Sequence, residues 1–259
     1  NAEVVVNGVS TGVQHYGYSS FLRDVTKLLH EGDNEIVVNV DNSQQRNTRW
    51  YSGSGIYRHV WLIETADVHF KHWGTFITTP IVDAEGTSQV SVKTTLVNES
   101  DRERIMQVKV CLQGATDDGG DLSATKETII RLQPNEERQA ELLIDVPNAH
   151  LWSPDTPYLY EANLSVSEQN NPNKTIDQVT ETFGIRSIAF NAEQGFLLNG
   201  QPIELNGGCL HHDNGILGAS AFDRAEERKA ELMKAAGFNA VRTSHNHPSS
   251  AFLDACDRI

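Results

Sequence analysis

The stretch DRAEERKAELMKAAGFNAVRTS at Asp223–Ser244 decides the fold of the C-terminal part of the chain. Its first part has the composition and apolar spacing of a helix, which Gly237 is expected to end. We expect Asp223 to cap this helix, with Glu226 three residues later completing a capping box. The residues after Gly237 are apolar and β-branched, so the stretch predicts a helix that leads directly into a buried strand.

The flanking segments extend this pattern. FLLNGQPI predicts a hairpin around Asn199-Gly200, IELNGG at 203–208 a short strand, and the residues after Pro248 a second helix. Alternating strands and helices are typical of a parallel sheet with crossovers, and a right-handed barrel is one continuation. Two strands cannot close a barrel, so we expect an incomplete one whose open apolar seam leaves Leu232, Met233 and Val241 poorly protected.

The first 183 residues read as β-structure. EVVVNGVSTG, NEIVVNVDN and HVWLIE predict short strands between Ala2 and Ile63, which we interpret as part of a sandwich. From Val68 to Phe183, strand-like segments and polar turns alternate, which predicts about seven strands in two packed sheets. The second region therefore resembles an immunoglobulin-like sandwich in architecture.

Composition excludes several classes of protein. The net charge of −14 disfavours nucleic acid as a partner, because such binding needs a basic face. We find no apolar run long enough to span a membrane. The cysteines, Cys111, Cys209 and Cys256, are odd in number and far apart, so we expect buried free thiols.

Polar residues follow both strands of the predicted barrel unit. His211, His212 and Asp213 come after the first strand, and the segment Arg242–His245 lies at the end of the second. Reactive groups of α/β barrels project from these strand ends, so we expect one pocket with an arginine and imidazoles. The alternative, which spacing alone leaves open, is that the histidines are loop residues satisfied by backbone groups.

Other candidate motifs are weaker. A triad of Asp213, His245 and Ser244 lacks a nucleophile elbow. We expect the carboxylates of Glu226 and Glu227 to be solvated on the surface of a helix. The glycines of RWYSGSGIYR precede no helix, so this segment is better interpreted as a tight loop that displays Arg49, Trp50 and Tyr51.

Five segments together carry a family resemblance: RWYSGSGIYRHVWL, LWSPDTPYLY, FGIRSIAF, GFLLNGQPIELNGGCLHHD and GFNAVRTSHNHPSSAFLDACDRI. They resemble glycoside hydrolase family 2, most closely its β-galactosidase branch. The resemblance implies a multidomain, mainly β chain: the C-terminal part of a jelly-roll sugar-binding domain at 1–65, an immunoglobulin-like β-sandwich at 66–185, and the first β/α units of a TIM barrel at 186–259. The signature of the family's barrel domain usually has Tyr-Pro at the positions that Asn246 and His247 occupy in this chain.

The same resemblance implies residue roles. Arg242 would contact the nucleophilic glutamate, and His211 and His245 would bind sugar hydroxyls. Second-rank candidates for substrate binding or site support are His212, Asp213 and Asn246. Arg49, which precedes Trp50, corresponds approximately to a position at which several relatives have an acidic residue that contacts the sugar. Both family glutamates are expected beyond Ile259, so no catalytic residue is assigned within the chain.

We therefore expect a retaining glycosidase that cleaves terminal β-linked sugars, most of all β-galactosides, and a 259-residue chain that is inert alone. The alternatives are a β-glucuronidase or β-mannosidase of the same family, or a non-catalytic carbohydrate-binding module. The expected partner is a carbohydrate substrate, and a homo-oligomer is compatible with the sequence. Relatives often need magnesium or sodium, but their ligands map onto no motif here and no metal site is assigned. A periplasmic or secreted location is favoured over a cytoplasmic one.

Overall fold

A computed structural model describes residues 1–43, 53–83, 85–116 and 119–259. The chain forms two compact units. Unit 1 comprises residues 1–60 and 206–256, and unit 2 comprises residues 61–205 and 257–259. Arg49 and Trp50 lie outside the described residues.

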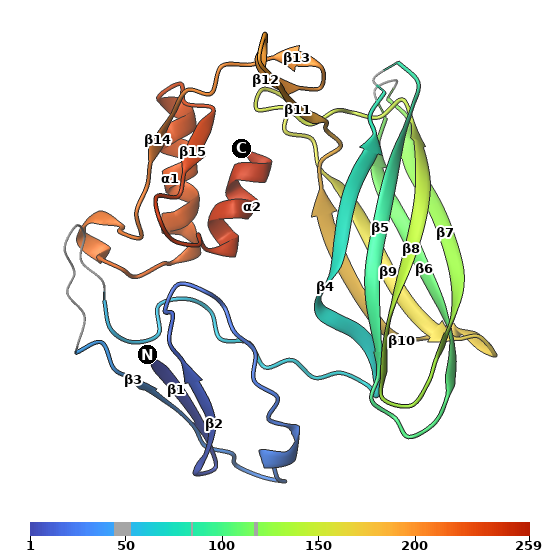
Figure 1. Ribbon diagram of the computed structural model, residues 1–259, viewed down its shortest axis with the longest axis vertical. Coiled ribbons are helices and arrows are strands. Elements are labelled where there is room, and N and C mark those ends of the chain that lie inside the picture. Colours follow the sequence, from blue (N-terminus) through green and yellow to red (C-terminus); the bar gives the residue numbers. More distant parts are fainter. Residues whose placement is uncertain (44–52, 84, 117–118) are drawn as a thin grey trace. The chain divides into compact units, whose positions relative to one another are not determined.

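Unit 2 is dominated by a β-sandwich of seven long strands, as Figure 1 shows. One sheet has the order β4-β5-β8 and the other β10-β9-β6-β7, and all pairings are antiparallel. The strands are β4 (Val68–Ile81), β5 (Thr87–Asn98), β6 (Arg104–Ala115), β7 (Asp121–Leu132), β8 (Glu136–Pro147), β9 (Tyr160–Glu168) and β10 (Asn171–Phe183). The predicted mainly β architecture with a two-sheet sandwich is confirmed.

The sandwich core follows from the alternation of side chains along each strand. In β6, Met106, Val108, Val110 and Leu112 are fully buried, whereas the residues between them face outward or are half-exposed. Since successive residues of a strand point to opposite faces, this period of two places one row of each strand between the sheets. Tyr160 is the largest fully buried side chain of this core.

Two of the quoted segments meet at the end of the sandwich. The backbone N–H of Trp152 donates to the carbonyl of Ile185 at 2.8 Å, and the Arg186 guanidinium lies 4.6 Å from the centroid of the Trp152 ring. A methyl group on Gly184 would come within 2.7–2.9 Å of three Trp152 atoms, so a glycine is needed for this close packing. The segments LWSPDTPYLY and FGIRSIAF therefore form one packed junction within unit 2.

A small sheet of order β11-β12-β13 follows the sandwich. It consists of β11 (Ile188–Asn191), β12 (Gly195–Leu198) and β13 (Gln201–Pro202). Asn199 and Gly200 connect the last two strands with φ values of 51° and 75°. Such positive angles characterise a type I′ hairpin, so the predicted Asn-Gly turn is confirmed.

Unit 1 begins with a three-stranded antiparallel sheet of order β2-β1-β3. Its elements are β1 (Ala2–Val6), β2 (Val9–Gln14), a single 3-10 turn η1 (Thr26–Leu28) and β3 (Ile36–Val40). The predicted strand HVWLIE is wrong: no strand is assigned at 59–64, and Val60, Trp61 and Leu62 are 71–75% exposed. Within the described ranges this segment has no neighbouring strand with which to form a ladder.

The second part of unit 1 is the strand-helix-strand-helix series that the sequence predicted (Figure 1). It consists of β14 (Gly207–Cys209), the 3-10 turn η2 (Gly215–Leu217), α1 (Asp223–Ala235), β15 (Ala240–Arg242) and α2 (Ser250–Arg258). Strand β14 is shorter and later than the predicted 203–208. Gly237, with φ of 85°, follows α1 as predicted.

The predicted capping box of α1 is wrong. Phe222 occupies the N-cap position and no side chain caps the helix. Asp223 is instead the first helical residue, and its carboxylate lies 2.9 Å from Nε2 of His59. A carboxylate in the first turn still interacts favourably with the helix dipole, so the acidic residue is accounted for without a cap.

Candidate functional site

The parallel pair β14 and β15 positions the candidate site. Gly207 lies opposite Ala240 and Cys209 opposite Arg242, so both strands end at the same edge of the sheet. A Cβ atom on Gly207 would lie 2.3 Å from the Ala240 carbonyl oxygen, and only glycine therefore permits this approach. The loops that follow the two strands begin side by side as a result.

His211 and His245 approach each other just beyond these strand ends. Their ring centroids are 6.0 Å apart and the ring planes are inclined by 74°. His211 is half-buried and His245 exposed. The structure thus brings together two imidazoles that the sequence placed at neighbouring strand ends, and imidazole can donate or accept a hydrogen bond at neutral pH.

Arg242 ends β15, and its side chain is exposed. Its Nη1 lies 3.8 Å from Sγ of Cys209 on the adjacent strand. A planar guanidinium in this position has donors available for a carboxylate, which it binds in a bidentate manner. The proposed contact with a catalytic carboxylate stays a prediction.

His212 is enclosed by residues from the N-terminal part of unit 1. Its ring stacks on Tyr18 with centroids 4.6 Å apart and an interplanar angle of 19°. Nη2 of Arg58 lies 3.4 Å from Nδ1 of His212. Burial, followed by the positive charge of Arg58, lowers the pKa of His212 to about 4, so the imidazole is neutral at pH 7.

Asn246 is half-buried and oriented by another N-terminal residue. The Tyr16 hydroxyl donates to Oδ1 of Asn246 at 3.1 Å. Nδ2 of Asn246 is buried and has no hydrogen-bond partner among the described residues. Asp213, in contrast, is exposed, and none of the contacts found in the described part of the chain joins it to these side chains.

Glu226 corrects the expectation of solvated charge on α1. It is only 4% exposed, and its carboxylate accepts hydrogen bonds from Lys229 at 2.9 Å, Ser249 at 3.1 Å and Asn214 at 3.3 Å. Burial alone would raise the pKa of Glu226, but Lys229 and the other donors lower it below its usual value. The carboxylate therefore joins the loop after β14, helix α1 and the start of α2.

A cavity of about 20 Å³ lies beside His211 and His212. This volume is sufficient for one water-sized group. Its walls combine charged and apolar side chains: Leu210, His211, His212, Glu226, Lys229, Thr243, Pro248 and Phe252. Residues of α1 and α2, among them the charged side chains of Glu226 and Lys229, therefore form part of the wall of this cavity.

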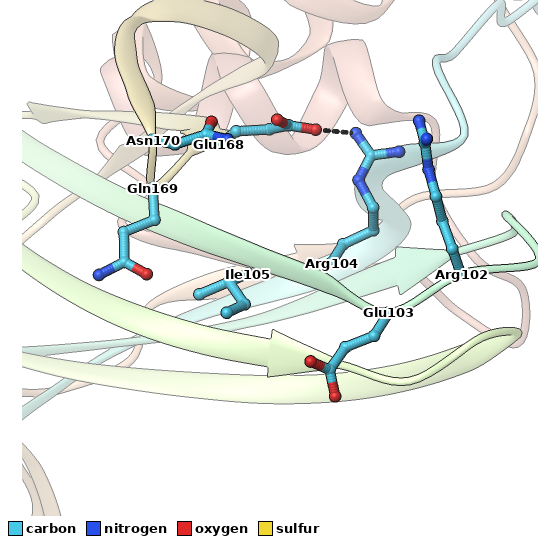
Figure 2. A pocket seen from close by; sticks show the side chains of 7 residues that line it. All are labelled: Arg102, Glu103, Arg104, Ile105, Glu168, Gln169 and Asn170. Carbon is cyan, nitrogen blue, oxygen red and sulfur yellow. Dashed lines mark hydrogen bonds and ion pairs between the residues drawn. The ribbon is translucent and has the colours of Figure 1, made fainter.

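A larger cavity of about 340 Å³ lies in unit 2, where β6 begins and the β9–β10 turn ends. Figure 2 shows Arg104 paired with Glu168 and the Arg102 side chain running beside Arg104. Its lining residues are Arg102, Glu103, Arg104, Ile105, Glu168, Gln169 and Asn170. None of these is aromatic or a histidine, and the chemistry expected for the site lies at the β14–β15 edge instead.

Sequence reasoning missed Tyr16, Tyr18 and Arg58. Arg58 lies inside the segment RWYSGSGIYRHVWL, whose interpretation concentrated on Arg49 to Tyr51. The aromatic spacing of HYGYSS at 15–20 was the one available signal for the tyrosines. Neither signal shows that these side chains contact His212 and Asn246, because these two partners are more than 150 positions away.

Metal binding receives no support from the described residues. No group of three His, Cys, Asp or Glu among them could hold a metal ion. The three cysteines are thiols, but Cys209 is exposed and the other two are half-exposed, so the expected burial is wrong.

No helix in the described ranges has the length and apolar character needed to cross a membrane.

Comparison with known families gives two consecutive matches. Residues 68–186 match the model of glycosyl hydrolases family 2, and residues 190–259 match the model of the TIM barrel domain of the same family. The two matched segments together cover most of the chain, and they coincide with the sandwich and with the strand-helix series.

Individual relatives extend this likeness to the whole chain. A β-galactosidase of Bacteroides ovatus is 42% identical over all of this chain, which covers 30% of that relative. A putative β-glucuronidase of Formosa agariphila is 34% identical, again over all of this chain and 24% of the relative. The crystal structure of a glycosyl hydrolase family 2 member from Bacteroides cellulosilyticus superposes with a TM-score of 0.92 at 44% identity, covering 100% of this chain and 35% of that one. The chain thus spans about a third or less of each of these proteins.

Proposed function

Since the chain belongs to glycoside hydrolase family 2, we propose that the whole protein is a retaining glycosidase that removes terminal β-linked sugars, with β-galactosides as its main substrates. The observation that carries this proposal is the likeness over the full chain to a β-galactosidase at 42% identity. The neighbouring imidazoles of His211 and His245, just beyond the strand ends of the barrel unit, support it, because hydroxyl-rich ligands need donors and acceptors at one place.

The proposal assigns the chain to three domains. Residues 1–65 belong to a sugar-binding domain, residues 66–185 form the immunoglobulin-like domain, and residues 186–259 begin the catalytic barrel. A retaining glycosidase uses two carboxyl groups about 5–5.5 Å apart, one as acid/base and one as nucleophile. We assign both to residues beyond Ile259, and the 259-residue chain alone is therefore inactive.

The residues of this chain serve binding and orientation. Arg242 holds the nucleophilic carboxylate ionised and oriented through charge-assisted hydrogen bonds. His211 and His245 bind sugar hydroxyls near the bond that is cleaved. His212 and Asn246 support this site, whereas the roles of Asp213, Arg49 and Trp50 stay predictions.

A second candidate is the hydrolysis of β-glucuronides. It is favoured by the putative β-glucuronidase that is 34% identical over all of this chain. A β-glucuronide differs from a β-galactoside in the orientation of its C4 hydroxyl and in carrying a carboxylate at C6, and recognition of that carboxylate requires additional donors or positive charge. The two candidates share the cleavage chemistry and differ in the groups that the site must bind at the sugar C4 and C6 positions.

Kinetics of the full-length protein test the proposal. We expect kcat/KM on an aryl β-galactoside to exceed that on the matching β-glucuronide, with the β-anomer as the first product. Arg242→Lys should lower kcat by about 10²–10³-fold, the usual effect of losing a preorganised electrostatic contact in the transition state. Arg224→Lys, an exposed change on α1, is the matched control.

Three results would contradict the proposal. Hydrolysis of the glucuronide alone would replace the first candidate by the second. Turnover by residues 1–259 alone would refute the assignment of both carboxylates to later residues. Full activity of Arg242→Lys would show that Arg242 does not orient the nucleophilic carboxylate.

A further inference from the structure

Arg58 joins the N-terminal part of unit 1 to both loops of the candidate site. Its Nη1 donates to the carbonyl of Tyr18 at 3.0 Å, and its Nη2 donates to the carbonyl of His247 at 2.8 Å. The same Nη2 lies 3.4 Å from Nδ1 of His212. One guanidinium therefore contacts the segment that carries Tyr18, the loop after β14 and the loop after β15.

The contact with His212 determines which ring nitrogen carries the proton. Arginine has only N–H donors and stays charged, so Nδ1 of His212 must be the acceptor. A neutral imidazole that accepts at Nδ1 carries its proton on Nε2. Nε2 is buried and has no hydrogen-bond partner among the described residues. The ring thus holds an N–H donor for which the described residues supply no acceptor.

We propose that Arg58 is a positioning residue for the sugar site: it holds His212 as the Nε2–H tautomer, which donates a hydrogen bond to an oxygen of the bound sugar. This inference rests on the proposed glycosidase function and adds a specific role for the first domain. An unsatisfied buried N–H is costly, and a ligand oxygen that accepts from it recovers that cost in the complex.

The surroundings of His212 keep the ring neutral and fixed. Burial and the charge of Arg58 lower its pKa to about 4, with smaller effects in the same direction from Lys229 and His211. Glu226 acts in the opposite direction without reversing the shift. Stacking on Tyr18 restricts rotation of the ring.

Asn246 shows the same arrangement on the adjacent loop. The Tyr16 hydroxyl donates to Oδ1, which orients the amide so that Nδ2 is left as a buried donor without a partner among the described residues. The N-terminal segment thus occupies the acceptor atom of both side chains and leaves both N–H groups for a ligand. Sugar hydroxyl and ring oxygens are acceptors of the required kind.

Nitrogen-detected NMR of the ¹⁵N-labelled chain tests the tautomer directly. At pH 7 we expect His212 to show a protonated Nε2 and an unprotonated Nδ1, with its signals identified by their loss in His212→Phe. In Arg58→Met the Nδ1–H tautomer should appear as well, and the conservative variant Arg58→Lys should retain more of the original form. Arg228→Met, an exposed change on α1, should leave the signals unchanged.

Kinetics of the full-length enzyme test the role in binding. On the better aryl glycoside, Arg58→Met and His212→Phe should each lower kcat/KM about tenfold, which corresponds to one hydrogen bond. Because Arg58 acts through His212, the double variant should lose little more than either single one. Far-UV circular dichroism of each variant verifies that it is folded.

Two results would overturn the proposal: an Nδ1–H tautomer in the unmodified chain, or losses in the double variant that multiply. Neither depends on which sugar is cleaved. If the full-length protein hydrolyses no glycoside, the proposed function fails, and the tautomer measurement then still decides whether Arg58 positions His212.

Discussion

Glu226 and Lys229, one turn apart on α1, form an ion pair of 2.9 Å that is almost entirely buried, with side chains 6% and 17% exposed. Ser249 also donates to this carboxylate, and its own Oγ accepts from the backbone N–H of Phe252 as the N-cap of α2. Glu226 thus connects α1 to the start of α2, which follows one of the loops of the candidate site.

Glu226→Ala should destabilise unit 1 by about 3–5 kcal/mol, because it leaves the buried Lys229 ammonium without its partner. Urea unfolding followed by circular dichroism measures this loss. Glu231→Ala is the matched control, since Glu231 pairs with Arg224 at the surface and such pairs contribute about 1 kcal/mol or less. Similar losses in both variants would show that the buried pair has no special importance.

His212 should make the stability of the chain depend on pH. The folded chain holds this imidazole neutral down to a pKa of about 4, whereas the unfolded chain binds the proton near 6.5. The unfolded state therefore binds more protons between these values, and stability falls as the pH drops from about 6.5 to 4. In His212→Gln this part of the decrease should be absent. An identical pH dependence of the urea midpoint in both proteins would contradict the lowered pKa.

Gly184→Ala should destabilise unit 2 by about 1–3 kcal/mol, the usual cost of overpacking. The new methyl group would lie 2.7–2.9 Å from Cβ, Cγ and Cδ1 of Trp152. Gly17→Ala serves as the control, because its methyl group meets no atom within 4 Å and its backbone lies outside the left-handed region. Thermal unfolding of both variants should show a lower midpoint only for Gly184→Ala.

The fold was predictable from local patterns. Alternation such as Val90, Val92, Thr94 and Leu96 specifies a strand with one buried face, and Asn199-Gly200 specifies a tight hairpin, whatever the rest of the chain does. The order of strand and helix around α1 likewise predicted a parallel pair, which β14 and β15 form. The strand at 59–64 was predicted wrongly because a strand also needs a neighbour, which its own sequence cannot reveal.

The site was predictable only in part, since its residues depend on distant partners. His211 and His245 could be placed together because they follow adjacent strands. Glu226 was misassigned because Ser249, 23 positions away, contributes to its burial. Arg58 was missed because His212 lies 154 positions later, and no spacing rule connects them.

The strand pair β14–β15 should open more readily than the core strands of the sandwich. Each strand has three residues, and Arg242 and Leu232 are exposed beside Met233 and Val241, which are only half-buried. In β6, by contrast, residues 106–112 are paired on both sides by β7 and β9. Short ladders with little buried apolar surface open more readily than the core of a large sandwich.

Hydrogen exchange of the chain measures this difference. We expect the amides of residues 240–242 to exchange at least about tenfold faster than those of 106–112, which corresponds to about 1.4 kcal/mol in opening free energy. The central strand β1 of unit 1, paired on both sides, is the internal reference and should fall between them. Equal protection of β15 and β6 would mean that the parallel pair is stabilised by contacts beyond its own short ladder.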